Sequence, residues 1–280
     1  MRLTPWRWRR ADPADAKPLR DELLSIDRLE ARALSLAASL TVDPNPRHRA
    51  RDTVSRFEDN VRVLRAADRT LADDVRTGEF VVSAADWLLD NFHLVTSEIV
   101  EIRRNLPRAY YRTLPTIAAR EHGGEARIYA IAVELVRHRD SRLARHELIQ
   151  FLNSYQRVAP LTIGELWAWP SMLRLALIEN LRRLAEELLS ARDARRAADR
   201  YMTHADSGHA RDPIPADAST AFLVQVLHRL REYGVRLSPV RTAVDEHLAA
   251  RHTTAEDTIR DEHQRQGIAQ VSVANAVTSL

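Results

Sequence analysis

The sequence predicts an all-α protein, and three observations carry the prediction. Only 7 of the 280 residues are glycine, and the chain is rich in alanine, leucine, arginine and glutamate, which favour helix. Apolar residues recur at spacings of three and four, as they do on one face of an α-helix. Strand-like alternation never lasts more than a few residues, and no Asn-Gly or Asp-Gly hairpin signal occurs. We expect a bundle of roughly eight to ten helices.

Residues 1–80 are predicted to be a polar helical hairpin behind a basic tail. The tail interleaves arginines with Trp6 and Trp8 and has no apolar segment typical of a secretory signal. An amphipathic helix is expected over residues 19–40, ended by the sequence DPNP. A second, polar helix follows it and stops near Gly78.

Residues 81–203 are predicted to be the main helical core. Ser83 and Asp86 have the spacing of a capping box, in which each side chain satisfies a backbone N–H at a helix start. One helix of about five turns should follow and end at Pro107. Its buried stripe is expected to consist of Leu88, Phe92, Val95, Ile99 and Ile102.

The centre of this core is predicted to lie near residues 171–190. Helices over residues 127–138 and 143–158 precede it. Thr162 and Glu165 form a second capping box, and Pro170 should end or kink the short helix that it starts. The next helix is apolar around most of its circumference, which is typical of a buried central helix.

The remaining chain is predicted to be a loop and further helices. Residues 204–217 form a loop with two prolines and are the best candidate boundary. Residues 218–280 should form C-terminal helices that pack on the core, the last one capped by Thr254 and Asp257. The chain ends in the apolar sequence VSVANAVTSL, so we expect the protein to be truncated there.

Composition excludes several kinds of site. There is no cysteine, so disulfides and thiolate metal sites are excluded. No run of about 18 apolar residues suggests a membrane span. Of 42 basic residues only Lys17 is a lysine, but 39 acidic residues leave a net charge of +3, so no nucleic-acid binding is expected. The chain has no G-x-G-x-x-G, P-loop or D-x-D sequence, and no cofactor is predicted.

The histidines and acids do not form a predicted catalytic or metal site. His146 and Glu147 begin the zinc pattern H-E-x-x-H, but Gln150 stands where the second histidine belongs. One loop carries residue types that can bind a metal, but we interpret it as a solvated loop. Three further residues share one helix face, and we interpret them as an ordinary polar face. The loop set is His204, Asp206, His209 and Asp212, and the helix set is Asp86, Asp90 and His93.

Four aromatic residues are candidates for carbohydrate contact: Trp167, Trp169, Tyr110 and Tyr111. Indole faces stack on sugar rings, and Glu165 lies beside both tryptophans in the sequence. Glu165 is already explained as a helix cap, however, and core packing is the expected role of both indoles.

Five strings carry a family resemblance: AADWLLDNFHLV, IRRNLPRAYYRTLP, RIYAIAVELV with a following DSRL, PLTIGELWAWPSMLRLALIENLRRLA and QVSVANAVTSL. In this order they resemble the amino-terminal helical region of bacterial cyclic β-1,2-glucan synthases, over about residues 81–280. The first eighty residues match that region only in being polar, charged and helical.

The resemblance implies a part in UDP-glucose-dependent glucan synthesis. Members of that family join this region to a membrane-embedded glycosyltransferase, a glucoamylase-like segment and a phosphorylase-like domain. The catalytic groups belong to those other regions, so no catalytic residue is carried over to this chain.

Three hypotheses follow for function. The first is a non-catalytic helical module in the cytoplasm, with a place at the periphery of the inner membrane as an alternative. Its partners would be other synthase domains or a second copy, with membrane contact only through partner regions. The second is a β-1,2-glucan-binding module. The third is a free-standing anion-binding or membrane-surface protein that uses arginine-rich faces and the WRWRR tail.

Overall fold

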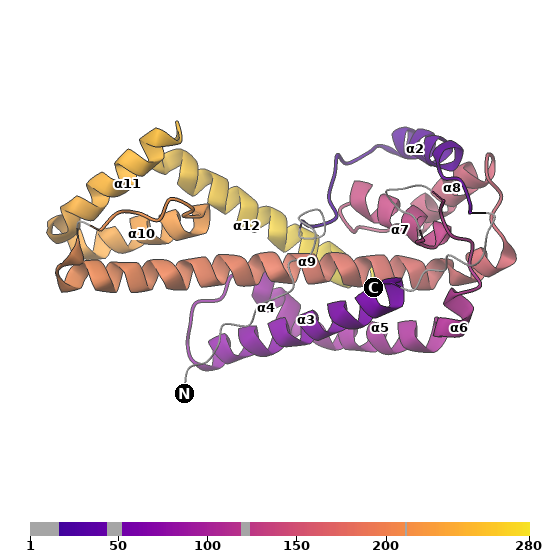
Figure 1. Cartoon of the computed structure of the whole chain (residues 1–280), viewed down its shortest axis with the longest axis horizontal. Coiled ribbons are helices and arrows are strands. Elements are labelled where there is room, and N and C mark those ends of the chain that lie inside the picture. The colour runs from indigo at the N-terminus through magenta and orange to yellow at the C-terminus, as the bar shows by residue number, and fades with distance from the viewer. Residues whose placement is uncertain (1–16, 44–51, 119–123, 211) are drawn as a thin grey trace. The chain divides into compact units, whose positions relative to one another are not determined.

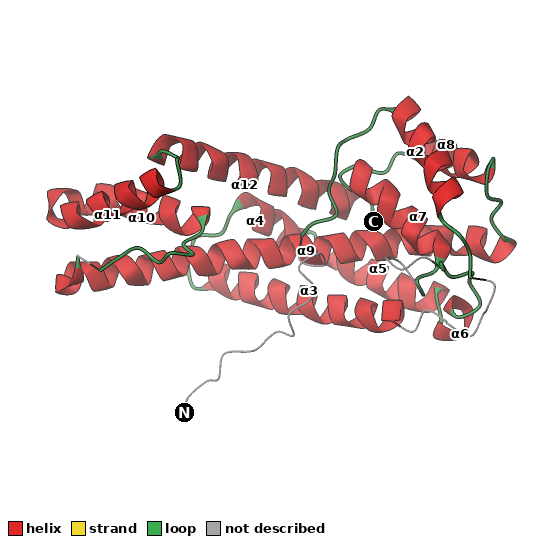
Figure 2. Ribbon diagram, turned by 45° about the horizontal axis from the view of Figure 1, so that its top comes forward, coloured by secondary structure: helices red, strands yellow, loops and turns green. Residues whose placement is uncertain are grey.

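The computed structural model describes residues 17–43, 52–118, 124–210 and 212–280, and these residues form an all-α fold (Figures 1 and 2). Within them, only isolated β-bridges occur beside the helices. The sequence-based fold class is therefore confirmed. The α-helices are α2 (Ile26–Ser39), α3 (Asp52–Arg76), α4 (Ser83–Asp90), α5 (Phe92–Asn105), α6 (Arg108–Tyr111), α7 (Arg127–His138), α8 (Arg145–Gln156), α9 (Ile163–His204), α10 (Thr220–Tyr233), α11 (Ser238–Ala250) and α12 (Ala255–Thr278).

The chain divides into two compact units, with one boundary inside α9 and another inside α12. Unit 1 comprises Met1–Glu186 and Ser272–Leu280, and unit 2 is Glu187–Val271. The sequence predicts domain boundaries after residues 80, 203 and 217. Whether the pieces between these boundaries fold independently stays a prediction.

The core of unit 1 is built around the first half of α9, as predicted. From residue 171 to 186 nearly every side chain is buried, because the helix has neighbours on all sides. The buried apolar residues are Met172, Leu173, Leu175, Ala176, Leu177, Ile178, Leu181, Leu184 and Ala185. Five polar residues are buried with them: Ser171, Glu179, Asn180, Arg182 and Arg183.

The start of α9 confirms one prediction and corrects another. The Glu165 carboxylate accepts from the Thr162 backbone N–H at 2.8 Å, and the Glu165 N–H donates to the Thr162 hydroxyl at 3.2 Å. This is the reciprocal pattern of a capping box. The helix then continues through Pro170 instead of ending there. Proline removes one backbone bond, but burial of the following turns on all sides outweighs that loss.

The predicted five-turn helix after Ser83 is wrong in two details. The chain forms two helices, α4 and α5, separated at Asn91. Val82 occupies the N-cap position and makes no side-chain cap bond, so the Ser83–Asp86 pair is not a capping box. The apolar stripe is nevertheless formed, since Leu88, Val95, Ile99 and Ile102 are buried and Phe92 is half-buried.

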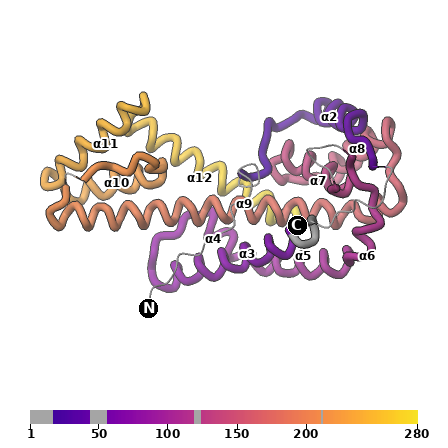
Figure 3. The backbone as a smooth tube through the Cα atoms, viewed as in Figure 1, coloured from indigo at the N-terminus to yellow at the C-terminus, as the bar shows by residue number. Residues whose placement is uncertain are grey.

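An extended segment, residues 17–25, leads into α2 (Figure 3). Buried side chains hold its backbone: the Leu19 N–H donates to Asn180 Oδ1 at 2.5 Å, and Arg183 donates to the Lys17 carbonyl at 3.0 Å. The helix that follows packs against α8. The expected basic tail and most of the DPNP turn lie outside the described residues.

Unit 2 has a separate apolar core under α10 and α11. Within the expected loop 204–217, residues Ala205–His209 form a π-helix, and Gly208 there has φ +110°. Gly234–Leu237 forms a 3-10 turn between α10 and α11. The Thr254 cap is confirmed, because its hydroxyl accepts from the Asp257 N–H at 3.1 Å. The core includes Met202, Phe222, Val226, Leu237, Val240, Val244 and Leu248.

Candidate functional site

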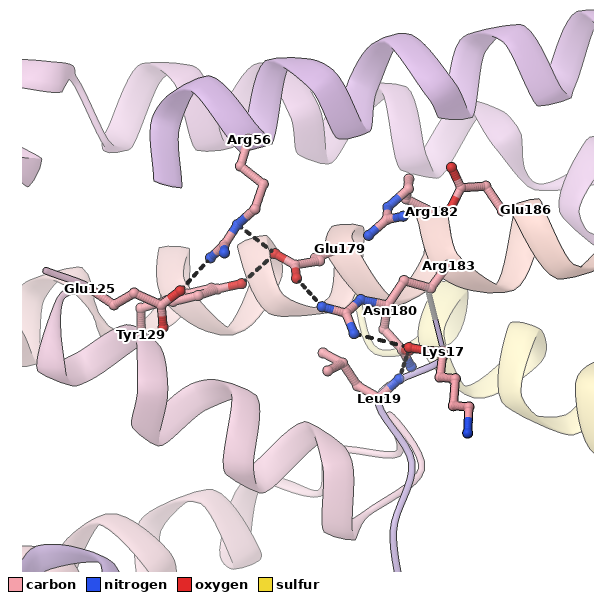
Figure 4. Close-up of polar contacts among 10 residues, drawn as sticks. All are labelled: Lys17, Leu19, Arg56, Glu125, Tyr129, Glu179, Asn180, Arg182, Arg183 and Glu186. Carbon is pink, nitrogen blue, oxygen red and sulfur yellow. Dashed lines mark hydrogen bonds and ion pairs between the residues drawn. The ribbon is translucent and has the colours of Figure 1, made fainter. Parts of the chain in front are cut away.

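A buried ionic network surrounds Glu179 in unit 1 (Figure 4). Its carboxylate accepts from Arg183 at 2.5 Å and from the Tyr129 hydroxyl at 2.6 Å, and it lies 3.3 Å from Arg56. Arg56 also donates to Glu125 at 2.8 Å and its guanidinium lies 5.5 Å from the Tyr129 ring centroid. Helices α3, α7 and α9, together with the turn before α7 that carries Glu125, thus supply the groups that meet there.

The charges in this network are matched, two arginines against two glutamates. Burial alone would raise the pKa of the Glu179 carboxyl, but Arg56, the Tyr129 hydroxyl and Arg183 together hold that pKa below its ordinary value. Burial, reinforced by Glu179, raises the pKa of Tyr129 well above its ordinary value. Both groups therefore keep one protonation state near neutral pH, which suits a cross-link between helices better than proton transfer.

A second buried pair braces the first turn of α9. Arg127 donates to both carboxylate oxygens of Glu165, at 2.8 and 2.6 Å, and to the Pro160 carbonyl at 3.1 Å. The Arg127 side chain is 8% exposed and the Glu165 side chain is 0% exposed. Glu165 thus caps its own helix and also joins α9 to α7.

A small pocket lies between α3, α5 and α9, apart from the Glu179 network. Its volume is about 120 Å³, and the exposed Glu58–Arg103 ion pair lies on its wall. The lining residues are Phe57, Glu58, Ile102, Arg103, Leu106, Pro107, Arg108 and Leu175. The pocket therefore offers apolar contact and arginines, without an arrangement of two acids across a cleft.

The structure does not bring the four aromatic candidates into one surface. Trp169 and Tyr111 are buried, at 9% and 1% exposure, whereas Trp167 is 79% exposed. Tyr110 is half-buried and its hydroxyl donates to the Gly164 carbonyl at 2.5 Å, which places it against the first turn of α9. Of the four, Trp167 alone leaves most of its side chain exposed to a ligand.

The histidine and acid sets of the sequence form no metal site in the part of the chain that the structure describes. In the loop set, the His204 and His209 rings are stacked with centroids 4.0 Å apart, and His204 lies 3.1 Å from Asp212. Glu147 is held by Arg139. In the described ranges, no helix is long and apolar enough to cross a membrane.

Sequence reasoning missed the Glu179 network. One signal was available, since Glu179 and Arg183 are spaced i, i+4 inside a helix that is apolar around most of its circumference. The contributions of Arg56 and Tyr129 had no local signal, because they come from positions far away in the chain.

Fold and buried charges together define an all-α module in which ion pairs join helices. No family model matches the chain. The chain is 33% identical, over 272 residues, to the cyclic beta-(1,2)-glucan synthase NdvB of Rhizobium meliloti (strain 1021). The match covers 94% of this chain and 10% of that protein, so the chain resembles a segment of it. It reaches well into residues 1–80, further than the five strings indicated.

Proposed function

We propose that this chain is a non-catalytic helical module that supports UDP-glucose-dependent glucan synthesis carried out by other domains. The observation that carries the proposal is its 33% identity, over 94% of its length, to a segment that makes up 10% of a cyclic β-1,2-glucan synthase. The engagement of the buried acids Glu165 and Glu179 by arginines also supports it. We place the module in the cytoplasm, where it contacts other synthase domains or a second copy.

The proposal predicts that the purified chain neither hydrolyses UDP-glucose nor transfers glucose from it. Release of UDP, followed by a coupled enzymatic assay, is the direct measurement. Circular dichroism of the same sample establishes that the chain is folded. Turnover above that of a heat-denatured sample would contradict the proposal.

A glucan-binding role is a second candidate because Trp167 is 79% exposed and an indole face can stack on a pyranose ring. Titration of tryptophan fluorescence with linear β-1,2-glucan tests it. A change in the original chain that W167A abolishes, and that W87A retains, would favour this role. No change at millimolar sugar would remove it.

A further inference from the structure

The first two turns of α9 carry an exposed apolar stripe. It consists of Ile163, Leu166, Trp167 and Pro170, which are spaced i, i+3, i+4 and i+7 and so share one helix face. Ile163 is 76% exposed, close to the 79% of Trp167. Ile163 and Trp167 therefore project from the surface, and most of each side chain is left uncovered by the described part of unit 1.

The two segments next to the stripe, residues 107–113 and 157–170, carry exposed arginines and no exposed acid. The Tyr110–Gly164 hydrogen bond holds α6 against the start of α9, and Figures 1 and 2 both place α6 at that end of the helix. In residues 107–113 and 157–170 no exposed residue is acidic, because the one acid there, Glu165, is buried on Arg127. The exposed charged residues of these two ranges are Arg108, Arg112 and Arg157, which we call the arginine rim.

This local composition departs from that of the chain as a whole, in which 39 acids nearly balance 42 basic residues. Arg108 lies near Glu58, whose carboxylate is already paired with Arg103. Arg112 and Arg157 have no acidic neighbour in their own segments. The surface therefore combines projecting apolar side chains with positive charge that its own segments do not neutralise.

We propose that this end of unit 1 docks on an anionic lipid bilayer, with the stripe inserted at the headgroup boundary and the arginine rim on lipid phosphates. Tryptophan and aliphatic side chains favour this boundary, and arginines beside them are attracted to anionic lipid. The proposal goes beyond the proposed function. It is an alternative to the expectation that membrane contact runs only through partner regions.

Co-sedimentation with sucrose-loaded vesicles tests the proposal. The purified chain should bind vesicles that contain phosphatidylglycerol and bind pure phosphatidylcholine more weakly, with a clear decrease as salt is raised. I163S/W167S should weaken binding roughly tenfold or more, because two apolar side chains no longer leave water. R112S/R157S should weaken it by roughly fivefold for each arginine removed.

Matched control variants test whether vesicle binding depends on this surface and not on exposed apolar or basic side chains in general. F80S/V235S removes two side chains of similar exposure, 74% and 89%, from other places. R200S/R231S removes two exposed arginines outside the rim. Both controls should bind like the original chain, and circular dichroism should show unchanged helix content in all variants.

Several results would overturn the proposal. One is that the original chain does not bind anionic vesicles. Another is that the control variants lose as much vesicle binding as I163S/W167S and R112S/R157S do. Loss in W6S/W8S without loss in I163S/W167S would assign binding to the amino-terminal tail instead. Self-association that I163S/W167S abolishes in sedimentation velocity, with vesicle binding unchanged, would assign the stripe to a second copy.

Discussion

Replacing Glu179 with glutamine tests whether the buried network holds unit 1 together. The side chain keeps its shape but loses the charge that balances Arg56 and Arg183. Breaking a buried ion pair from one side costs about 3–5 kcal/mol, because a charge stays buried without compensation. Since glutamine can still accept hydrogen bonds, we expect the free energy of unfolding to fall by about 3 kcal/mol. Urea unfolding at pH 7, followed by far-UV circular dichroism, measures it.

The same variant makes a prediction about pH. The pKa of Glu179 is lower in the folded protein than its ordinary value of 4.5. Its contribution is therefore fully present above that value and is lost as pH falls through the folded pKa. The stability gap between the original chain and E179Q should close under acid conditions, since a protonated glutamate and a glutamine are both neutral.

Glu101 provides the matched control in the same unit. Its side chain is 40% exposed and lies 3.8 Å from Arg104. E101Q should change the free energy of unfolding by no more than about 0.5 kcal/mol. An E179Q variant as stable as E101Q, or a gap that persists in acid, would refute the structural role of the network.

Three further outcomes are expected in urea unfolding. R127M should cost about 3–5 kcal/mol by stranding the Glu165 carboxylate, and R127M/E165M should recover most of that loss; a double variant no better than the single one would contradict the pairing. W169A should cost about 3–5 kcal/mol and W167A less than about 0.5 kcal/mol, whereas equal costs would contradict their different burial. T254A should cost about 1 kcal/mol through the lost α12 cap, and a neutral result would show that the cap contributes nothing.

Local signals in the sequence predicted the helices and several of their ends. The Thr162–Glu165 and Thr254–Asp257 caps need only residues three apart, and both form. Ser83 shows the limit of such spacing, because the helix begins at Ser83 itself and Val82 takes the cap position. A cap pattern does not reveal where the helix starts.

Pro170 and the buried charges depend on packing that local pattern does not contain. A proline is tolerated in α9 because the helix after it is buried on all sides, which only the assembled fold shows. Arg127 and Glu165 are 38 residues apart, so nothing near either residue indicates the other. Spacing also could not tell that Trp167 would face outward while Trp169, two residues later, faces the core.

We propose that this chain supports glucan synthesis without performing a catalytic step. The most direct measurement is UDP release from UDP-glucose by the purified, folded chain, with a full-length cyclic β-1,2-glucan synthase as the positive control. We predict no release above the heat-denatured sample. Sustained release that scales with the amount of this chain would contradict the claim.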